Sequence, residues 1–236
     1  MPDLAIPDSP PQTSIEGADP GIVWCDDPAG LMRIGEPAVR VVIWRRAQPA
    51  PLAAALAREK FENLPEACLT VAPAAARAAL QALFAARPRG LWPLAEDVAG
   101  LASHFAAMLG LAKVHIRLER LAHDACSLFH IDFVSARLIK TYIGPTTEYL
   151  PEFATDRTGL GLGRNERICR DPRAVRRLPP GAVGVFKGSR GAAGPAGAAV
   201  HRSPPVEADG AVRYVLVIDD AAAIAPPAIS RASGCR

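Results

Sequence analysis

The sequence predicts an α+β fold, in which an N-terminal helical segment packs on a cupin-like jelly-roll barrel. Two features indicate this fold. Residues 51–110 are rich in alanine and are divided by prolines into helix-length pieces, whereas residues 114–219 contain short alternating runs that end in turns. Helices followed by strands predict separate layers with an antiparallel sheet rather than β–α–β repeats. Many short strands are typical of a jelly roll.

The N-terminal part is predicted to be an irregular arm followed by a mainly helical segment. Residues 1–38 are rich in Pro, Gly and Asp and show no sustained periodicity, which favours an irregular arm. The β-branched run at 39–44 predicts one strand at the start of the helical segment, which spans 39–110. Prolines and Gly110 delimit the helices expected there, which are 51–63, 73–86 and 94–109.

Strands are expected from residue 111 onward, so the barrel is assigned to 111–220. Val114, Ile116 and Leu118 alternate with polar residues, which predicts a half-buried strand. Further strands are expected around the segments 126–132, 137–143, 182–186, 198–202 and 212–219.

Three segments of the C-terminal half are expected to lack regular structure. The polar stretch 151–180 is interpreted as a solvated loop or lid, and Gly188–Gly197 as a glycine-rich loop. Both are expected to contact the substrate, because long loops at a barrel mouth commonly determine specificity. Residues 221–236 are predicted to be a flexible tail.

Composition narrows the compartment and the partners. The net charge is only +3, and the six arginines between 164 and 177 are interrupted by acids and prolines, so a nucleic-acid partner is not expected. Five scattered cysteines without a CxxC motif indicate reduced thiols and a cytoplasmic protein. We expect no membrane partner, because the sequence has neither a signal peptide nor an apolar run of bilayer length. The substrate and the oligomeric state cannot be named from sequence.

Four residues in chain order form a candidate metal and ligand site. If residues 126–132 run as a strand, His130 and Asp132 point to the same face, because side chains two apart share a face. His201 lies on a late strand, and Arg213 begins the next one. Val215 and Val217 share the face of Arg213 by the same rule, which predicts a buried guanidinium and therefore an anionic partner.

The chemistry of these residue types favours Fe(II). Two imidazoles and one carboxylate form the facial triad of non-haem Fe(II) oxygenases, which leaves three positions for a bidentate 2-oxo acid and dioxygen. Arg213 could then pair with the far carboxylate of 2-oxoglutarate, since a guanidinium offers a planar fork that stays charged. Either Thr141 or Tyr142 could add a hydroxyl, and Tyr142 is favoured. Arg137, Lys140 and Glu148 are expected to be surface or salt-bridge residues.

Three alternatives stay open. The histidines could be ordinary polar residues of a barrel. The chain could be a metal-binding cupin-like module without oxygenase chemistry, in which His123 and Cys126 add ligands suited to zinc. Cys126 could also act as a nucleophile, although no residue is seen that would orient a base.

Two resemblances extend this interpretation. His130-x-Asp132, Arg137-Leu-Ile-Lys-Thr-Tyr, Gly181-Ala-Val-Gly-Val-Phe, Val200-His201 and Arg213-Tyr resemble the 2-oxoglutarate and Fe(II)-dependent dioxygenases, especially the prolyl-hydroxylase-like branch. The resemblance spans about 114–219. It implies a double-stranded β-helix with His130, Asp132 and His201 as iron ligands and Arg213 as the 2-oxoglutarate-binding residue.

The second resemblance covers most of the chain. The motifs Phe129-His-x-Asp132, Arg137-Leu-x-x-Thr-Tyr-x-Gly-Pro-x-Thr-Glu148, Lys187-Gly and His201-Arg-Ser-Pro-Pro205 are similar to a bacterial family of unknown function, DUF1826. That similarity implies no activity. The function predicted from sequence is therefore a dioxygenase that hydroxylates an unknown substrate.

Overall fold

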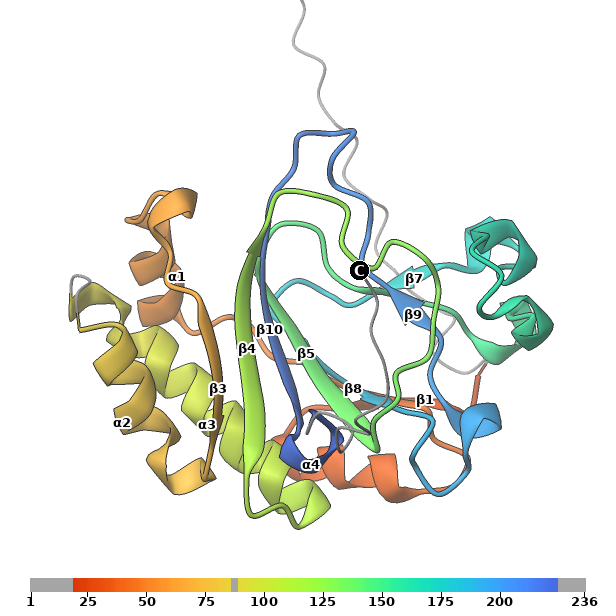
Figure 1. Ribbon diagram of the computed structural model, residues 1–236, viewed down its shortest axis with the longest axis horizontal. Helices are drawn as coiled ribbons and strands as arrows, with labels where there is room; N and C mark the ends of the chain where they lie inside the picture. The colour runs from red at the N-terminus through yellow and green to blue at the C-terminus, as the bar shows by residue number, and fades with distance from the viewer. Residues whose placement is uncertain (1–18, 86–88, 225–236) are drawn as a thin grey trace, which may run out of the picture.

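A seven-stranded sheet forms the centre of the molecule. The computed structural model describes residues 19–85 and 89–224 (Figure 1). In spatial order the strands of this major sheet are β1 (Ile22–Cys25), β2 (Val41–Trp44), β8 (Val183–Lys187), β5 (Ala136–Ile143), β10 (Arg213–Asp220), β4 (Val114–Leu121) and β3 (Ala67–Val71). Neighbouring strands are antiparallel except β1 and β2, which are parallel.

A small second sheet faces the centre of the major sheet. Its strands in order are β7 (Arg176–Arg177), β6 (Glu148–Tyr149) and β9 (His201–Arg202). An isolated antiparallel bridge between His130 and His201 adds a further segment beside β9. The two sheets pack through a shared apolar cluster that includes Tyr149 of β6 and Ile139 and Val215 of the major sheet.

The order in which the chain visits the two sheets defines the fold. From β4 the chain passes to the His130 segment in the small sheet, returns to β5, continues to β6 and β7, and returns to β8. It then crosses to β9 and finally to β10. Antiparallel strands that alternate in this way between two facing sheets form a double-stranded β-helix, the jelly roll. The α+β fold class with a jelly-roll barrel is therefore confirmed.

The helices cover the other face of the major sheet (Figure 1). They are α1 (Ala50–Ala57), α2 (Pro73–Leu83) and α3 (Trp92–Leu109). Each begins with a proline in its first turn, where a missing N–H costs nothing, and α3 ends at Gly110 with φ 65°. Val98 and Phe105 of α3 are fully buried in the cluster that contains Ile116 of β4 and Leu216 of β10.

Short 3-10 helices and one C-terminal turn complete the described chain. They are η1 (Pro28–Gly35), η2 (Phe61–Asn63), η3 (Arg89–Leu91), η4 (Glu152–Ala154), η5 (Arg157–Gly159), η6 (Asn165–Arg167), η7 (Pro172–Ala174), η8 (Pro195–Gly197) and α4 (Ala221–Ile224). Four of them lie in 151–180, so this polar stretch is a loop apart from β7. Among the described helices, none combines the length and apolarity needed to cross a membrane.

Two strands of the major sheet depart from the sequence prediction, as do the short strands β6 and β7 of the small sheet, which lie outside the predicted strands. β1 lies in the stretch predicted to be an irregular arm, and β3 lies in the segment predicted to be helical after residue 44. Both pair at the edges of the major sheet, so these N-terminal residues extend the sheet of the barrel. Residues 1–18 of the predicted arm and 225–236 of the predicted tail lie outside the described residues.

A buried ionic cluster joins β5 to α3 behind the sheet. Asp97 Oδ1 accepts a hydrogen bond from Arg46 (2.7 Å), and Oδ2 accepts one from Tyr142 (2.8 Å) and lies 3.4 Å from Lys140 Nζ. Lys140 is fully buried. Burial lowers the pKa of its ammonium group to about 8.

Replacing Lys140 by methionine is expected to stabilise the protein at pH 7 by about 1–3 kcal/mol. Methionine has a similar volume and carries no charge to desolvate, and Asp97 keeps its hydrogen bonds from Arg46 and Tyr142. The pKa of Lys140 in the folded protein lies below the ordinary 10.5. Between about pH 8 and pH 10.5 the unfolded chain therefore binds more protons at this residue than the folded protein does. Wild-type stability should therefore gain from this group as pH rises through that window, and the advantage of Lys140→Met should shrink. Urea unfolding at pH 7 and pH 10 measures both effects. The exposed control Lys113→Met should show neither, and a Lys140→Met protein destabilised at both pH values would contradict the prediction.

Candidate metal centre

The structure brings His130, Asp132 and His201 together. One potential ligand atom from each lies within 4.8 Å of the others. Asp132 Oδ2 is 3.2 Å from His201 Nε2, and Asp132 Oδ1 is 3.7 Å from His130 Nε2. The convergence that a metal site requires is thus present, and the role of these residues as ligands stays a prediction.

Backbone pairing holds the two histidines side by side. His130 N donates to His201 O at 3.0 Å, and His201 N donates to His130 O at 3.1 Å. Their rings lie 4.7 Å apart, centre to centre. The expected regular strand at 126–132 is wrong, because only this bridge forms and Cys126 adopts the left-handed region with φ 50°. His130 nevertheless occupies a paired position, so its side chain is fixed by the tertiary fold.

Both imidazoles present Nε2 to the carboxylate. His130 Nδ1 is 2.8 Å from the carbonyl oxygen of Leu128, and His201 Nδ1 is 3.4 Å from that of Ala199. A carbonyl oxygen can only accept, so His130 Nδ1 carries the proton and Nε2 keeps a free lone pair when the ring is neutral. Orientation of a ring through its second nitrogen is typical of metal-binding histidines.

Asp132 is buried with one oxygen engaged and one free. Arg137 Nη1 donates to Oδ1, whereas Oδ2 has no hydrogen-bond partner among the described residues. Burial raises the pKa of Asp132, but the imidazoles of His130 and His201 and the charge of Arg137 outweigh it and lower the pKa overall. A buried carboxylate whose two oxygens face two imidazole nitrogens is a donor set that a divalent metal ion satisfies.

The glycine-rich loop holds the backbone that follows Asp132. Ser189 donates from both N (2.8 Å) and Oγ (2.9 Å) to the carbonyl oxygen of Asp132. A Cβ at Gly188 would collide with the Val134 carbonyl, so this close approach requires glycine. The loop therefore positions a site residue, a role that differs from the substrate contact expected from sequence.

A second carboxylate fixes the arginine that holds Asp132. Arg137 donates from Nε (2.7 Å) and Nη2 (3.0 Å) to the two oxygens of Asp219, which is fully buried on β10. The bidentate geometry leaves Nη1 for Asp132. Arg137 was expected to be a surface or salt-bridge residue, and it is a salt-bridge residue whose partner lies in the candidate site. Asp219 was missed, although it shares strand parity with Arg213.

Arg213 is buried as predicted, with only 2% of its surface exposed. It donates from Nε to Pro145 O (2.8 Å), from Nη1 to Ser203 Oγ (2.7 Å) and from Nη2 to Thr147 Oγ1 (3.3 Å). No carboxylate of the described residues lies within ion-pair distance of it. Burial lowers the pKa of Arg213 to about 10. A buried guanidinium held only by neutral oxygens is suited to an anionic ligand.

The choice of Tyr142 over Thr141 is wrong. Tyr142 lies on the helix-facing side of β5, in the apolar cluster under the helices, and donates to Asp97. The alternation of side chains along β5 instead puts Thr141 on the face of Ile139, which lines the cavity. Thr141 is buried, and its hydroxyl has no partner among the described residues.

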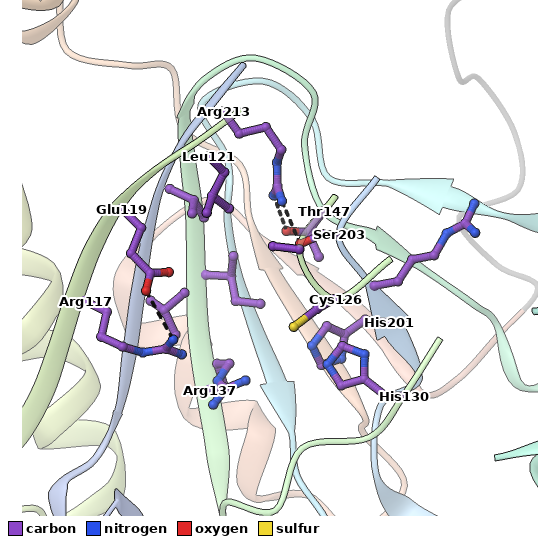
Figure 2. Close-up of a pocket in the computed structure, with 15 residues that line it drawn as sticks. Arg117, Glu119, Leu121, Cys126, His130, Arg137, Thr147, His201, Ser203 and Arg213 are labelled. Carbon is purple, nitrogen blue, oxygen red and sulfur yellow. Dashed lines mark hydrogen bonds and ion pairs between the residues drawn. The ribbon is translucent and has the colours of Figure 1, made fainter. Parts of the chain in front are cut away.

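Both histidines, Arg137 and Arg213 line one cavity between the sheets (Figure 2). Figure 2 shows Arg117 and Glu119 of β4 on one side, His130 and His201 on the other, and Arg213 at one end. The walls also contain apolar side chains from three strands of the major sheet, which are Leu121, Ile139, Val215 and Val217. Arg117 and Glu119 were not singled out from sequence. Their alternation with Ile116 and Leu118 was the available signal.

The remaining candidates do not join the metal cluster. Cys126 lines the cavity, and His123 is exposed. Lys140 is the buried lysine behind the sheet described above. Glu148 is buried and paired with Arg177 (2.7 Å) and Arg202 (2.7 Å), so it is a salt-bridge residue.

Comparison with known proteins identifies one family. The model of the family described as "Protein of unknown function (DUF1826)" matches residues 25–219. A search of curated proteins gives no match. Among solved structures, the chain is similar to the Arabidopsis thaliana dioxygenase for auxin oxidation 1 (9% identity, 84% of this chain and 91% of that chain, TM-score 0.45). It is also similar to a Pseudomonas putida prolyl-4-hydroxylase (16% identity, 81% of this chain and 96% of that chain, TM-score 0.42).

Proposed function

We propose that this chain, which belongs to the DUF1826 family of proteins of unknown function, is an Fe(II)- and 2-oxoglutarate-dependent dioxygenase that hydroxylates a substrate. The observation that carries the proposal is the buried Asp132 carboxylate, whose oxygens lie 3.2 Å and 3.7 Å from the Nε2 atoms of His201 and His130 and whose Oδ2 has no hydrogen-bond partner among the described residues. The two histidines line the same cavity as Arg213, a buried arginine without an acidic partner among the described residues.

The donor set supports Fe(II) as the metal. His130 and His201 supply borderline nitrogen donors, Asp132 supplies a hard oxygen, and three protein ligands leave coordination positions open. When bound, Fe(II) with 2-oxoglutarate would supply the oxidising power to insert one oxygen atom of dioxygen into a C–H bond. The protein's own part is to fix three ligand atoms and to keep the Asp132 carboxylate ionised.

Arg213 supports 2-oxoglutarate as the cosubstrate. Its guanidinium lines the cavity that contains the histidines, and its neutral partners leave its charge uncompensated. A carboxylate at the far end of a dicarboxylic acid would supply that compensation, and the hydroxyls of Thr147 and Ser203 could share the hydrogen bonding. Binding through this end would direct the 2-oxo acid end toward His130 and His201.

Anaerobic titration tests the proposal directly. Protein purified without chelators is loaded with Fe(II), 2-oxoglutarate is added, and the visible charge-transfer band of the chelated 2-oxo acid is recorded. We expect the band to appear with 2-oxoglutarate and not with glutarate, which has the same two carboxylates but no 2-oxo group. Absence of the band at saturating Fe(II) would overturn the dioxygenase assignment.

One observation favours a second candidate function. Cys126 lines the same cavity, although it lies outside the cluster of His130, Asp132 and His201. A thiolate that joined the two imidazoles would favour zinc in a metal-binding module without oxygenase chemistry. Competition between Zn(II) and Fe(II) in the wild type and in Cys126→Ser distinguishes the two. A selective loss of Zn(II) affinity in the variant would support the zinc module.

Arg137→Gln is expected to weaken metal binding by about 10–100-fold, the usual effect of removing a residue that orients a ligand. The glutamine loses the bidentate contact with Asp219, so Asp132 is no longer held with Oδ2 toward His201. A competitive chelator titration measures the affinity without turnover. The exposed control Arg33→Gln should bind metal as the wild type does, and equal affinities in all three proteins would contradict a positioning role for Arg137.

A further inference from the structure

We infer that the substrate is a small zwitterion, an α-amino acid with an apolar side chain, held by Arg117 and Glu119 on β4. The inference rests on the proposed function, because it assigns a substrate class to that same cavity. It follows from which charged groups of the cavity are still free, how these groups are arranged, and what lies between them and the histidines.

Most charged side chains of the cavity wall are already engaged. Apart from the histidines, the charged residues of the wall are Arg117, Glu119, Arg137, Arg202 and Arg213. Arg137 and Arg202 make short ion pairs with buried carboxylates. Arg213 is assigned to the cosubstrate. Arg117 and Glu119 therefore remain to recognise a substrate.

The contacts of Arg117 and Glu119 leave binding capacity unused. Arg117 Nη1 lies 3.5 Å from Glu119 Oε1, and Arg117 Nη2 lies 3.6 Å from Asp219 Oδ2. Both distances exceed the roughly 2.7–2.9 Å of a good charge-assisted hydrogen bond. The side chains of Arg117 and Glu119 are 31% and 37% exposed, so a ligand can reach them. A positive and a negative group thus stand side by side with free donors and acceptors.

The spacing of these two groups matches one class of small molecule. Arg117 and Glu119 are two residues apart on one strand, so both face the cavity and their opposite charges adjoin. An α-amino acid carries its ammonium group and its carboxylate on the same carbon atom, so its two opposite charges are also adjacent. Its carboxylate can accept from the Arg117 guanidinium while its ammonium group donates to Glu119. Interior residues of a peptide and the bases of a nucleic acid carry no such pair.

The surface next to the pair is apolar. Leu121 continues the cavity face of β4, and Ile139, Val215 and Val217 line the same cavity. Figure 2 places Arg117 and Glu119 across the cavity from His130 and His201. An amino acid held at β4 would lay its side chain on this apolar surface and direct it toward the candidate metal centre. An apolar side chain is favoured, because a polar one would lose hydrogen bonds to water without replacing them.

Calorimetry on the protein loaded with Fe(II) and 2-oxoglutarate under anaerobic conditions tests the inference. L-leucine, L-valine and L-phenylalanine are titrated, with their N-acetyl amides as uncharged controls. We expect at least one free amino acid to bind about 10-fold or more tightly than its N-acetyl amide. Arg117→Gln and Glu119→Gln should each weaken that binding by about 10-fold or more. The matched control is Arg77→Gln, which removes an exposed Arg77–Glu96 pair of similar length (3.8 Å) between α2 and α3 and should bind as the wild type does.

Two readouts keep the inference separate from the proposed function. The charge-transfer band is recorded without any amino acid, so its absence bears on the dioxygenase assignment alone. If the band forms and no amino acid binds, or if N-acetyl amides bind equally well, the substrate class is wrong. If amino acids bind with the expected dependence on Arg117 and Glu119 but no band forms, the binding site stands and the dioxygenase assignment fails. Unchanged binding in both glutamine variants overturns the inference.

Discussion

His201→Ala is expected to lower the affinity for Fe(II) by more than about 100-fold, since loss of a ligand exceeds the 10–100-fold effect of losing its supporting contacts. His201 is buried, and its Nε2 lies 3.2 Å from the free oxygen of Asp132. Alanine leaves only one imidazole and one carboxylate on the site. Metal content after purification without chelators, followed by a competitive chelator titration, measures the loss.

His123→Ala is the matched control for this change. His123 is exposed and belongs to the same connection between β4 and β5 as His130, but it is absent from the metal cluster. We expect its metal affinity to equal that of the wild type, and His130→Ala to behave like His201→Ala. If His201→Ala keeps wild-type metal affinity while remaining folded, the assigned metal site is wrong.

The sequence predicted the barrel face of β10 correctly because period two needs no knowledge of neighbouring strands. Val215 and Val217 are buried on the cavity side, and Arg213 is buried with them. The same rule did not identify the residue of β5 that faces the barrel. It separates Thr141 from Tyr142, but nothing in the sequence indicates which of these two hydroxyls lies on the cavity side. In the structure Ile139 marks the cavity face, which places Thr141 there and Tyr142 under the helices.

The geometry at His130 could not be predicted from the segment that contains it. Its backbone position is set by the hydrogen bonds with His201, which is 71 residues later in the chain. The segment between β4 and β5 lacks a regular strand, so local periodicity carried little information. The two predicted halves of the site converge in the structure, and their role as metal ligands stays a prediction. The fold supplied the register that joins them.

The sequence did not predict the edge strands β1 and β3 or the contact between Arg137 and Asp219, and the reasons are related. β1 and β3 are short and each pairs along one side only, so their strand character comes from the neighbouring strand rather than from their own composition. The contact between Arg137 and Asp219 follows from the antiparallel register of β5 and β10. Either residue alone looks like an ordinary surface charge, and only pairing of the strands reveals a carboxylate that orients the arginine at Asp132.

Arg213→Met is expected to weaken 2-oxoglutarate binding by about 30-fold or more, since truncating one partner of a buried charge pair costs about 2–5 kcal/mol. Methionine fills a similar volume but offers no charge and no donors. Arg213→Lys should lie between the two, because an ammonium group keeps the charge and loses the planar fork. Calorimetry with 2-oxoglutarate and the Fe(II)-loaded protein measures the affinity without turnover.

Metal affinity separates this effect from a general disruption of the site. Arg213 contacts Pro145, Ser203 and Thr147 but none of the three candidate ligands, so Fe(II) binding in Arg213→Met should match the wild type. Arg173→Met, which replaces an exposed arginine of the 151–180 loop, should change neither affinity. If Arg213→Met binds Fe(II) and 2-oxoglutarate with wild-type affinity, the buried guanidinium is a structural group and the cosubstrate must be anchored elsewhere. If the variant loses affinity for 2-oxoglutarate but keeps its affinity for Fe(II), the two halves of the site act separately. The histidines and Asp132 then hold the metal, and Arg213 binds the carboxylate of the cosubstrate.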